Sequence, residues 1–386
     1  MAGKEKSSSL GPSFMKKIKI LECIRQGQIG GGESHLLSLV ENLDRSRFEP
    51  YVLSFTDGPM VDRLKEMGIE TFIIPTTKPF DFTKWGAVKK LLKEKQIDLV
   101  HAHGTRANSN VLWAARSLKI PVIYTVHGWS FHPDQKALIR NIRIRGEKYL
   151  TSKSNINISV STSNQQTGKD YISSFQSVVI NNGIDPKKFD PQKNFKDIRS
   201  EIGIKEDAIL ILFIARFTSH KQPLALIEAF AKALPQNNKI HLLMVGDGDQ
   251  KEEAVQLIKN LSIENKITLQ FFRQDVPDVL AAADIFVLPS LWEGLPIGLL
   301  EAMAMGKAII ASNVDGTKEI IRNNDNGILV ETDNLVSNLA KEIAHLSQDA
   351  ELRKKFSQNA IATVKEKYNA ADMTGKIEKI YTSLVK

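Results

Sequence analysis

The residues best suited to chemistry lie in the segment EGLPIGLLE, which runs from Glu293 to Glu301 after an apolar run at 285–288. Pro296 favours the first turn of a helix, because its missing N–H would have no partner there. The free backbone N–H groups of such a turn bind phosphate. Carboxylates accept hydrogen bonds from sugar hydroxyls, each contributing about 1.5–3 kcal/mol when shielded from water. On spacing alone, an ordinary helix start with nearby acidic residues explains the segment equally well.

A pair of cations, Arg216 and Lys221, follows a second apolar run in the sequence IARFTSHKQ. Arg can grip phosphate oxygens with two parallel hydrogen bonds, and Lys acts as a movable point charge. The pair at the end of a strand therefore suits a diphosphate. Two solvated loop cations are the alternative interpretation.

Three consecutive glycines, residues 30–32, follow the first apolar run. Because they lack side chains, Gly31 and Gly32 let the backbone approach a ligand closely and present N–H groups to it. The spacing does not match Gly-x-Gly-x-x-Gly, and no acidic residue stands suitably after the next strand. A dinucleotide-dependent dehydrogenase is therefore disfavoured.

The histidines and one pair of aspartates raise the question of a metal. His127 ends an apolar run and is placed to contact a substrate, with a packed core histidine as the alternative. His101 and His103 share one strand face, but no acidic or Cys cluster offers a clear third ligand. Asp247 and Asp249 form a triplet of the kind that can hold a divalent metal, yet the flanking glycines indicate a turn. We expect no metal and no other cofactor.

These candidates sit in a chain where strand-like apolar runs alternate with helical patterns. One series spans residues 16–180 and a second spans 208–330, with a Pro- and Lys-containing link at 186–196. Such alternation predicts two α/β domains with parallel sheets, whose carboxyl edges face a cleft between them. We predict a first domain at 15–188, a second at 189–368, and a terminal helix at 369–386.

Composition is that of a globular protein, with 42% hydrophobic and 25% charged residues and no apolar run long enough to span a bilayer. Residues 1–14 are polar and predict a disordered tail or an artificial leader. The single cysteine, Cys23, excludes an internal disulfide and favours a reducing compartment, by default the cytoplasm.

The positive charge is concentrated in the first half, where residues 1–190 hold 28 Lys and Arg against 18 Asp and Glu. This asymmetry suggests an anionic partner, with a solvated basic surface as the alternative. Residues 135–150 predict an amphipathic helix, with Leu138, Ile142 and Tyr149 roughly along one side and four basic residues nearby. Such a helix can rest on an anionic membrane surface, although a packed helix with a solvated rim is the alternative.

In order and spacing, these motifs resemble glycosyltransferase family 4, whose members are retaining enzymes with the two-domain GT-B fold. The resemblance covers essentially residues 16–386. It rests on these segments: the Arg216–Lys221 pair, Val245-Gly-Asp-Gly, residues 276–326 with both glutamates, Gly31-Gly32-x-Ser, residues 98–116 and 125–131, and Asn182-Gly-Ile-Asp185. The chain departs from the pattern at Phe271, where the family often has glycine in the loop that meets the base.

The resemblance implies a role for each candidate. Arg216 and Lys221 would neutralise the donor diphosphate, Glu301 would bond the ribose hydroxyls, and Glu293 would address the transferred sugar. Backbone contacts to sugar and phosphate would come from Gly294, Leu295, Pro296 and Ile297. Gly31 and Gly32 would approach the diphosphate from the other domain, and His127 would lie by the sugar and the reacting centre.

The implied reaction is metal-independent transfer of a hexosyl or N-acetylhexosaminyl group with retention, by same-face attack in which the departing phosphate helps to deprotonate the acceptor. The implied donor is a UDP-sugar, with GDP second, and the acceptor a glycan or lipid-linked molecule in polysaccharide or glycolipid biosynthesis. The terminal helix would return to the first domain. We expect no nucleic-acid partner and a cytoplasmic protein, peripheral to the membrane if the basic helix binds it. A non-catalytic nucleotide-sugar-binding protein and a GT-B-like epimerase are the alternatives.

Overall fold

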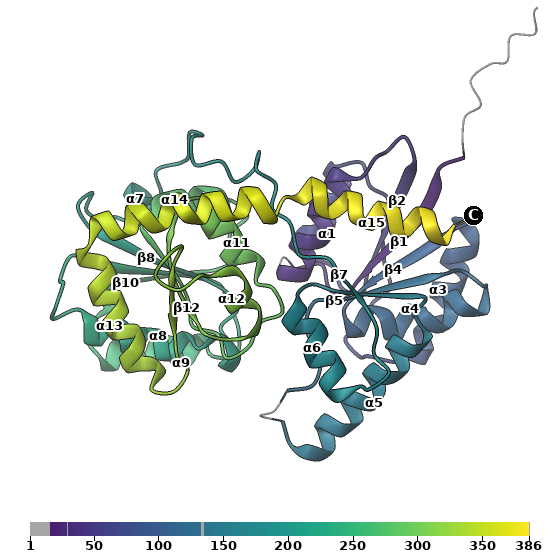
Figure 1. Ribbon diagram of the computed structural model, residues 1–386, viewed down its shortest axis with the longest axis horizontal. Coiled ribbons are helices and arrows are strands. Elements are labelled where there is room, and N and C mark those ends of the chain that lie inside the picture. Colours follow the sequence, from purple (N-terminus) through teal and green to yellow (C-terminus); the bar gives the residue numbers. More distant parts are fainter. Residues whose placement is uncertain (1–15, 29, 133–134, 386) are drawn as a thin grey trace, which may run out of the picture.

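The computed structural model describes residues 16–28, 30–132 and 135–385, which form two α/β domains side by side (Figure 1). The predicted tail at 1–14 lies outside the described residues. Each domain is built on one parallel sheet, and the strand orders are β3-β2-β1-β4-β5-β6-β7 and β10-β9-β8-β11-β12-β13. In both sheets the order reverses beside the first strand of the domain, which is the doubly wound arrangement that places ligand sites at the carboxyl edge. The predicted pair of Rossmann-like domains is confirmed.

The first sheet contains β1 (Ile18–Ile24), β2 (Phe48–Ser54), β3 (Thr71–Ile73), β4 (Leu99–His103), β5 (Val122–Val126), β6 (Ile156–Ser159) and β7 (Val178–Val179). Its helices are α1 (Gly31–Asn42), α2 (Pro59–Glu66), α3 (Phe82–Glu94), α4 (Thr105–Ser117), α5 (Ala137–Lys153) and α6 (Thr162–Tyr171). Strands β4 and β5 are buried along their whole length, as expected for a parallel sheet covered on both faces.

The second sheet contains β8 (Ile209–Ile214), β9 (Ile240–Val245), β10 (Ile267–Gln270), β11 (Ile285–Leu288), β12 (Ala308–Ser312) and β13 (Ile328–Val330). Its helices are α7 (Ile198–Glu201), α8 (Pro223–Ala233), α9 (Lys251–Asn260), α10 (Val276–Ala282), α11 (Ile297–Ala304), α12 (Asp315–Ile320), α13 (Leu335–Gln348) and α14 (Ala350–Lys367). Two short 3₁₀ helices, η1 (Ser219–Lys221) and η2 (Glu264–Lys266), complete the domain.

The chain crosses between the domains twice, and the two crossings touch. Ile184 donates its N–H to the carbonyl of Tyr368 at 2.7 Å, and Ala370 donates back to Ile184 at 3.1 Å. At this point a Cβ on Gly183 would lie 2.6 Å from the Asn369 carbonyl oxygen, so only glycine fits. The crossings thus form one hydrogen-bonded hinge region.

The terminal helix α15 (Ala370–Leu384) returns to the first domain, as the resemblance implied. Figure 1 shows α14 and α15 in yellow, following one another across both domains. Met373, Ile377 and Tyr381 are buried and pack with strand and helix residues of the first domain, including Ile20 and Phe48. Burial of this apolar face holds the end of the chain on the first domain.

The glycines at 31 and 32 open helix α1, with Gly30 as the N-cap residue. One local expectation changes. Pro296 is the N-cap residue of α11, one position before the first helical residue. Among the described residues, no helix is both long and apolar enough to cross a bilayer.

Candidate active site

The candidates from both domains meet where the carboxyl edges of the two sheets face each other. Gly294, which follows β11, lies so near the backbone of His127, which follows β5, that an added Cβ would lie 2.1 Å from the His127 carbonyl oxygen. The Ser161 hydroxyl also donates to the Gly294 carbonyl at 2.8 Å. The EGLP loop of the second domain, residues 293–296, is therefore in direct contact with the first domain.

The structure joins Lys221 and Glu293 in an ion pair, with the Lys Nζ donating to a Glu carboxylate oxygen. The side chains are only 16% and 10% exposed, so water screens this pair weakly. The loops that carry them are also held together, since Leu291 donates its N–H to the His220 carbonyl at 2.8 Å. Lys221 and Glu293 thus belong to the same part of the candidate site.

Arg216 follows β8 and is supported by the turn that contains Asp247. A Cβ at Gly246 would lie 2.0 Å from the Ala215 carbonyl oxygen, and one at Gly248 would lie 2.4 Å from the Phe217 carbonyl oxygen. Phe217 also donates its N–H to the Asp247 carbonyl at 2.9 Å. The glycines of this turn therefore allow the close packing that positions Arg216. Within the part of the chain that the structure describes, Asp247 and Asp249 belong to no cluster with metal-ligand spacing.

The carbonyl oxygens of the EGLP loop are already bonded. The Glu293 carbonyl accepts from the Gly316 N–H at 3.1 Å. The Gly294 carbonyl accepts from the Ser161 hydroxyl, and the Leu295 carbonyl accepts from the Asn182 side-chain amide, both at 2.8 Å. Gly316 comes so close that a Cβ there would lie 2.1 Å from the Gly294 carbonyl oxygen. The loop is fixed from three sides, two of them in the first domain.

The backbone N–H groups of the same loop behave differently from its carbonyl groups. Across the described ranges, those of Gly294, Leu295 and Ile297 make no hydrogen bond, and Ile297 opens α11. The side chains of Leu295 and Ile297 are buried in the core and cannot reach a ligand. The loop therefore offers a ligand its N–H donors, which together with the helix start form an anion site. Pro296 contributes packing and no donor.

Glu301 lies more than one turn into α11, away from the Lys221–Glu293 pair. The pKa of Glu301 is raised to about 7, because the effect of burial outweighs the opposing effect of Lys188 from the segment between the domains. A carboxylate in this setting gains from hydroxyl donors, because they would replace the water that it has lost. Phe271, where the chain departs from the family pattern, follows β10, and its side chain is 71% exposed.

Across the interface, Gly31 and Gly32 form the first turn of α1. A Cβ on Gly32 would come within 3.5 Å of the His127 ring, whereas one on Gly31 would meet nothing within 4 Å. A distance of 3.5 Å is ordinary van der Waals contact, so packing requires glycine at neither position, and at Gly31 the lack of a side chain leaves open space beside a helix N-terminus.

Glu33, in the same first turn, is a site residue that sequence reasoning passed over. Its carboxylate is 1% exposed, lies 3.5 Å from Arg25 and has no hydrogen-bond partner among the described residues. Burial raises its pKa, while Arg25 and Arg216 lower it. Its place three residues after the N-cap glycine is the available sequence signal, because acidic residues are favoured there.

His127 is linked to a buried histidine cluster. Its Nε2 lies 3.1 Å from Nδ1 of His103, whose Nε2 lies 2.8 Å from the Glu22 carboxylate. The expectation that no acidic residue accompanies His101 and His103 is therefore wrong: Glu22 pairs with His101 across β1 and β4. Among the residues that the structure describes, two groups have metal-ligand spacing, Glu22/His101/His103 and His35/His103/His127.

Further contacts between the domains were also missed. Glu319 of α12 accepts hydrogen bonds from the backbone N–H groups of Thr162 and Ser163, at the N-terminus of α6. The side-chain carbonyl oxygen of Asn182 accepts a hydrogen bond from His35 Nδ1 at 2.9 Å, so His35 carries a proton on Nδ1. Asn182 thereby connects α1 of the first domain to the EGLP loop. No local sequence pattern reveals such pairings.

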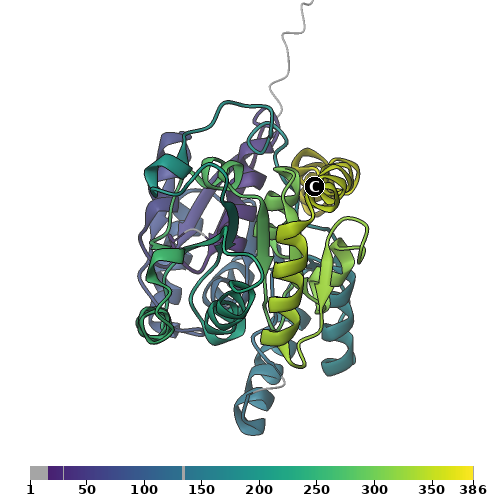
Figure 2. The same cartoon turned by 90° about the vertical axis from the view of Figure 1, so that its left-hand side faces the viewer.

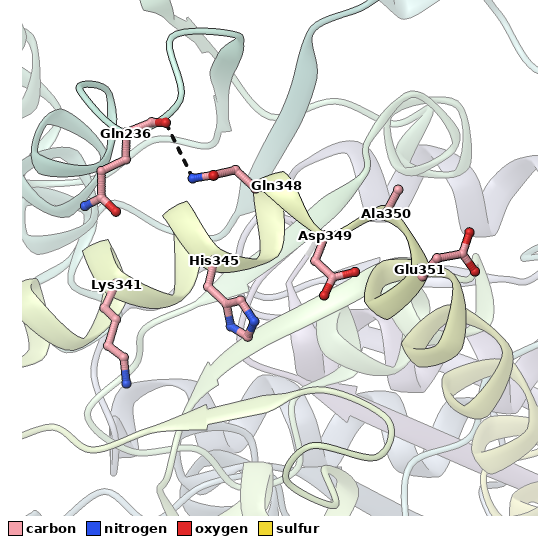
Figure 3. Close-up of a pocket in the computed structure, with 7 residues that line it drawn as sticks. All are labelled: Gln236, Lys341, His345, Gln348, Asp349, Ala350 and Glu351. Atoms are coloured by element: carbon pink, nitrogen blue, oxygen red, sulfur yellow. Dashed lines mark hydrogen bonds between the residues drawn. The ribbon is translucent and has the colours of Figure 1, made fainter.

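A separate surface hollow of about 590 Å³ lies far from these residues, between the end of α8 and the α13–α14 corner (Figure 3). Figure 3 shows Gln348 reaching the carbonyl of Gln236 and Lys341 and His345 projecting from α13. Most of its lining side chains are exposed, and it is not at a sheet's carboxyl edge. Its geometry gives it no part in the site.

Comparison with known proteins agrees with this geometry. Residues 29–188 match the family Glycosyltransferase Family 4, and residues 194–363 match the family Glycosyl transferases group 1. A similar curated protein is the UDP-Gal:alpha-D-GlcNAc-diphosphoundecaprenol alpha-1,3-galactosyltransferase of Escherichia coli, 28% identical, with 97% of this chain and 99% of that protein covered. Another is the N,N'-diacetylbacillosaminyl-diphospho-undecaprenol alpha-1,3-N-acetylgalactosaminyltransferase of Campylobacter jejuni, 27% identical, with 91% and 95% covered.

Among solved structures, Anabaena HepE in complex with UDP and glucose superposes with a TM-score of 0.83 at 23% identity, covering 95% of this chain and 100% of that chain. WaaG, a glycosyltransferase involved in lipopolysaccharide biosynthesis, superposes with a TM-score of 0.74 at 19% identity, covering 94% and 99%. These likenesses show the GT-B fold. The two family matches together span most of the chain, which therefore belongs to glycosyltransferase family 4 and is a glycosyltransferase.

Proposed function

We propose that the protein transfers a hexosyl or N-acetylhexosaminyl group from a UDP-sugar to a lipid-linked or glycan acceptor, with retention of configuration and without a metal. The observation that carries the proposal is the EGLP loop, whose carbonyls are bonded and whose N–H groups are free beside Lys221. Such a set of donors suits a diphosphate. The printed names of relatives support the substrate classes, since one acts on a diphosphoundecaprenol-linked sugar and another was solved with UDP and glucose.

In this proposal the protein stabilises the charge that develops as the nucleoside diphosphate leaves. Arg216, Lys221 and the N–H groups at the start of α11 are held in place before reaction, so little reorganisation is needed. Glu293 holds Lys221 at that position and has its second oxygen for the sugar. Glu301 accepts from the ribose hydroxyls. Retention follows from attack on the face that the phosphate leaves, with that phosphate taking the acceptor proton.

We also propose that helix α5 binds an anionic membrane surface, where a lipid-linked acceptor would be found. Leu138, Ile139 and Ile142 are 73%, 45% and 57% exposed. Basic side chains lie along the same helix, and α5 extends beyond the rest of its domain in Figures 1 and 2. Apolar insertion combined with basic charge is the signature of a peripheral membrane helix. This exposure argues against the interpretation of α5 as an ordinary packed helix.

The donor is tested by incubating the protein with UDP-, GDP- and dTDP-sugars, with and without EDTA, and measuring release of nucleoside diphosphate. We expect slow hydrolysis of one UDP-sugar, with water replacing the acceptor, and no change in EDTA. Hydrolysis of a GDP- or dTDP-sugar alone would contradict the UDP assignment. Loss of activity in EDTA would contradict metal independence, and UDP-sugar binding without any turnover or transfer would favour the non-catalytic alternative.

The site is tested with Lys221→Ala and Glu301→Gln. Each should reduce turnover of the donor by roughly tenfold or more, because a charged hydrogen-bonding partner is lost. Since the pKa of Glu301 is about 7, the KM for the donor should rise as the pH falls below neutrality, when the carboxylate gains a proton. Glu301→Gln should flatten this pH profile.

Lys232→Ala, at an exposed position of α8, is the matched control and should keep full activity. Thermal unfolding of each variant separates loss of fold from loss of function. If Lys221→Ala and Glu301→Gln both fold and both retain wild-type turnover, the donor-site assignment is wrong.

Membrane binding is tested by sedimentation with phosphatidylglycerol and phosphatidylcholine vesicles. We expect binding to the anionic vesicles that weakens with salt, and about a fivefold or greater loss with Leu138→Ser/Ile142→Ser. Leu261→Ser, another exposed apolar position in the second domain, serves as control. Equal binding to neutral vesicles, or none to either, would refute the membrane proposal.

A further inference from the structure

A buried polar cluster that the donor site leaves unused lies beneath His127. Glu22 of β1, His101 and His103 of β4 and Tyr381 of α15 are each at most 1% exposed. Burying this many polar groups is costly unless each is paired. The hydrogen bonds of the cluster run without a break from the terminal helix to His127.

We propose that Glu22 and His103 are positioning residues that fix the tautomer of His127, so that its Nδ1 faces the site as an unprotonated hydrogen-bond acceptor. The consequence of this tautomer rests on the proposed function: His127 accepts a hydrogen bond from a hydroxyl of the sugar or of the acceptor, and does not donate one to it. The tautomer itself follows from the hydrogen bonds together with the neutral state of His103 and His127.

Glu22, when ionised, can only accept hydrogen bonds. It accepts from the Tyr381 hydroxyl at 2.6 Å and lies 2.8 Å from His103 Nε2. The two strand histidines hold the pKa of Glu22 below its usual range against the opposing effect of burial. His103 must therefore carry a proton on Nε2.

His103 then determines His127. Burial and the neighbouring His101 lower the pKa of His103 to about 4, so it is neutral near pH 7 and has a single proton. With that proton on Nε2, its Nδ1 is an acceptor. His127 Nε2, at 3.1 Å, must donate to it.

His127 is itself kept neutral, because burial and the adjacent histidines lower its pKa. Its one proton is on Nε2, which leaves a lone pair on Nδ1. That nitrogen has no partner in the described part of the chain, and the half-buried ring lies against Gly32 of the helix start. His127 is thus located between the glycine turn, which approaches Cγ and Cδ2 of its ring, and the EGLP loop, which approaches its backbone carbonyl.

The other side of the cluster is consistent with this order. His101 Nδ1 lies 2.6 Å from the Tyr381 oxygen, whose own proton goes to Glu22, so Nδ1 must donate. His101 Nε2 lies 2.7 Å from the Thr125 hydroxyl oxygen, which can accept from it or donate to it. On this side of the cluster, the Tyr381 hydroxyl proton and the His101 Nδ1 proton each have one place.

A divalent metal on His35, His103 and His127 is the competing interpretation, since their ring nitrogens have suitable spacing and His35 Nε2 is unpartnered. Such an ion would need lone pairs on both His103 Nδ1 and His127 Nε2. The hydrogen bond between those two atoms requires a proton on one of them. The two interpretations therefore predict opposite protonation at His127 Nε2.

The test is long-range nitrogen–proton correlation NMR on the full chain labelled at histidine, with His127 assigned by comparison with His127→Asn. At neutral pH we expect the wild-type protein to show a protonated Nε2 and an unprotonated Nδ1 at His127, unchanged by added zinc. A protonated Nδ1, or a zinc-dependent loss of the Nε2 proton, would overturn the proposal. This measurement needs neither donor nor acceptor, so it stands or falls separately from the proposed function.

Variants test which residues impose the tautomer. Glu22→Gln introduces an amide that can donate as well as accept, and should produce a mixed or reversed tautomer at His127. Tyr381→Phe removes a hydroxyl but leaves the Glu22–His103 bond, and should keep the wild-type tautomer. An unchanged tautomer in folded Glu22→Gln would overturn the role of Glu22; if that variant does not fold, His103→Leu replaces it, with the same expectation of a lost preference.

In the transfer or hydrolysis assay, Glu22→Gln should lower kcat about tenfold or more with little change in KM, because the donor contacts are intact. His127→Asn places an amide oxygen near the position of Nδ1 and should retain more activity than His127→Leu. Equal activity of His127→Asn and His127→Leu would contradict the acceptor role.

Discussion

The EGLP loop has its carbonyl oxygens bonded, while its N–H groups have no partner among the described residues, and contacts from both domains maintain this arrangement. Ser161 and Asn182 hold the loop from the first domain, and Gly316 holds it from the second. Because each carbonyl has a partner, the groups that remain for a ligand are N–H donors, which bind an anion and not a cation. Glu293 holds the ammonium group of Lys221 at the same place, where water screens its charge weakly.

The fold and the residues nearest to the donor could be predicted from sequence for a physical reason. Buried parallel strands are apolar throughout, so the alternation of strand and helix is visible, and ligand sites follow the strand ends. Arg216, Lys221 and Glu293 all come directly after such strands. The glycines at 246 and 248 were read as a turn, but their close approach to residues 215–217 became evident only with the structure.

The remaining site residues could not be predicted, because they depend on strand order and on contacts between the domains. Glu22 is the neighbour of His101 only because β1 pairs with β4, which lies about 80 residues later (His101 is 79 positions beyond Glu22). Asn182 and Glu319 act across the interface, where no periodicity relates the partners. Buried polar networks of this kind are specified by three-dimensional packing, and the C-terminal helix completes one of them through Tyr381.

The central claim is that the free N–H groups of the EGLP loop and Lys221 bind the diphosphate of the donor. A crystal structure of the protein with UDP tests it most directly. The account predicts the diphosphate within hydrogen-bond distance of the N–H groups of Leu295 or Ile297 and of Lys221, with the ribose hydroxyls on Glu301. A diphosphate bound elsewhere, or one held through a metal on Asp247 and Asp249, would contradict it.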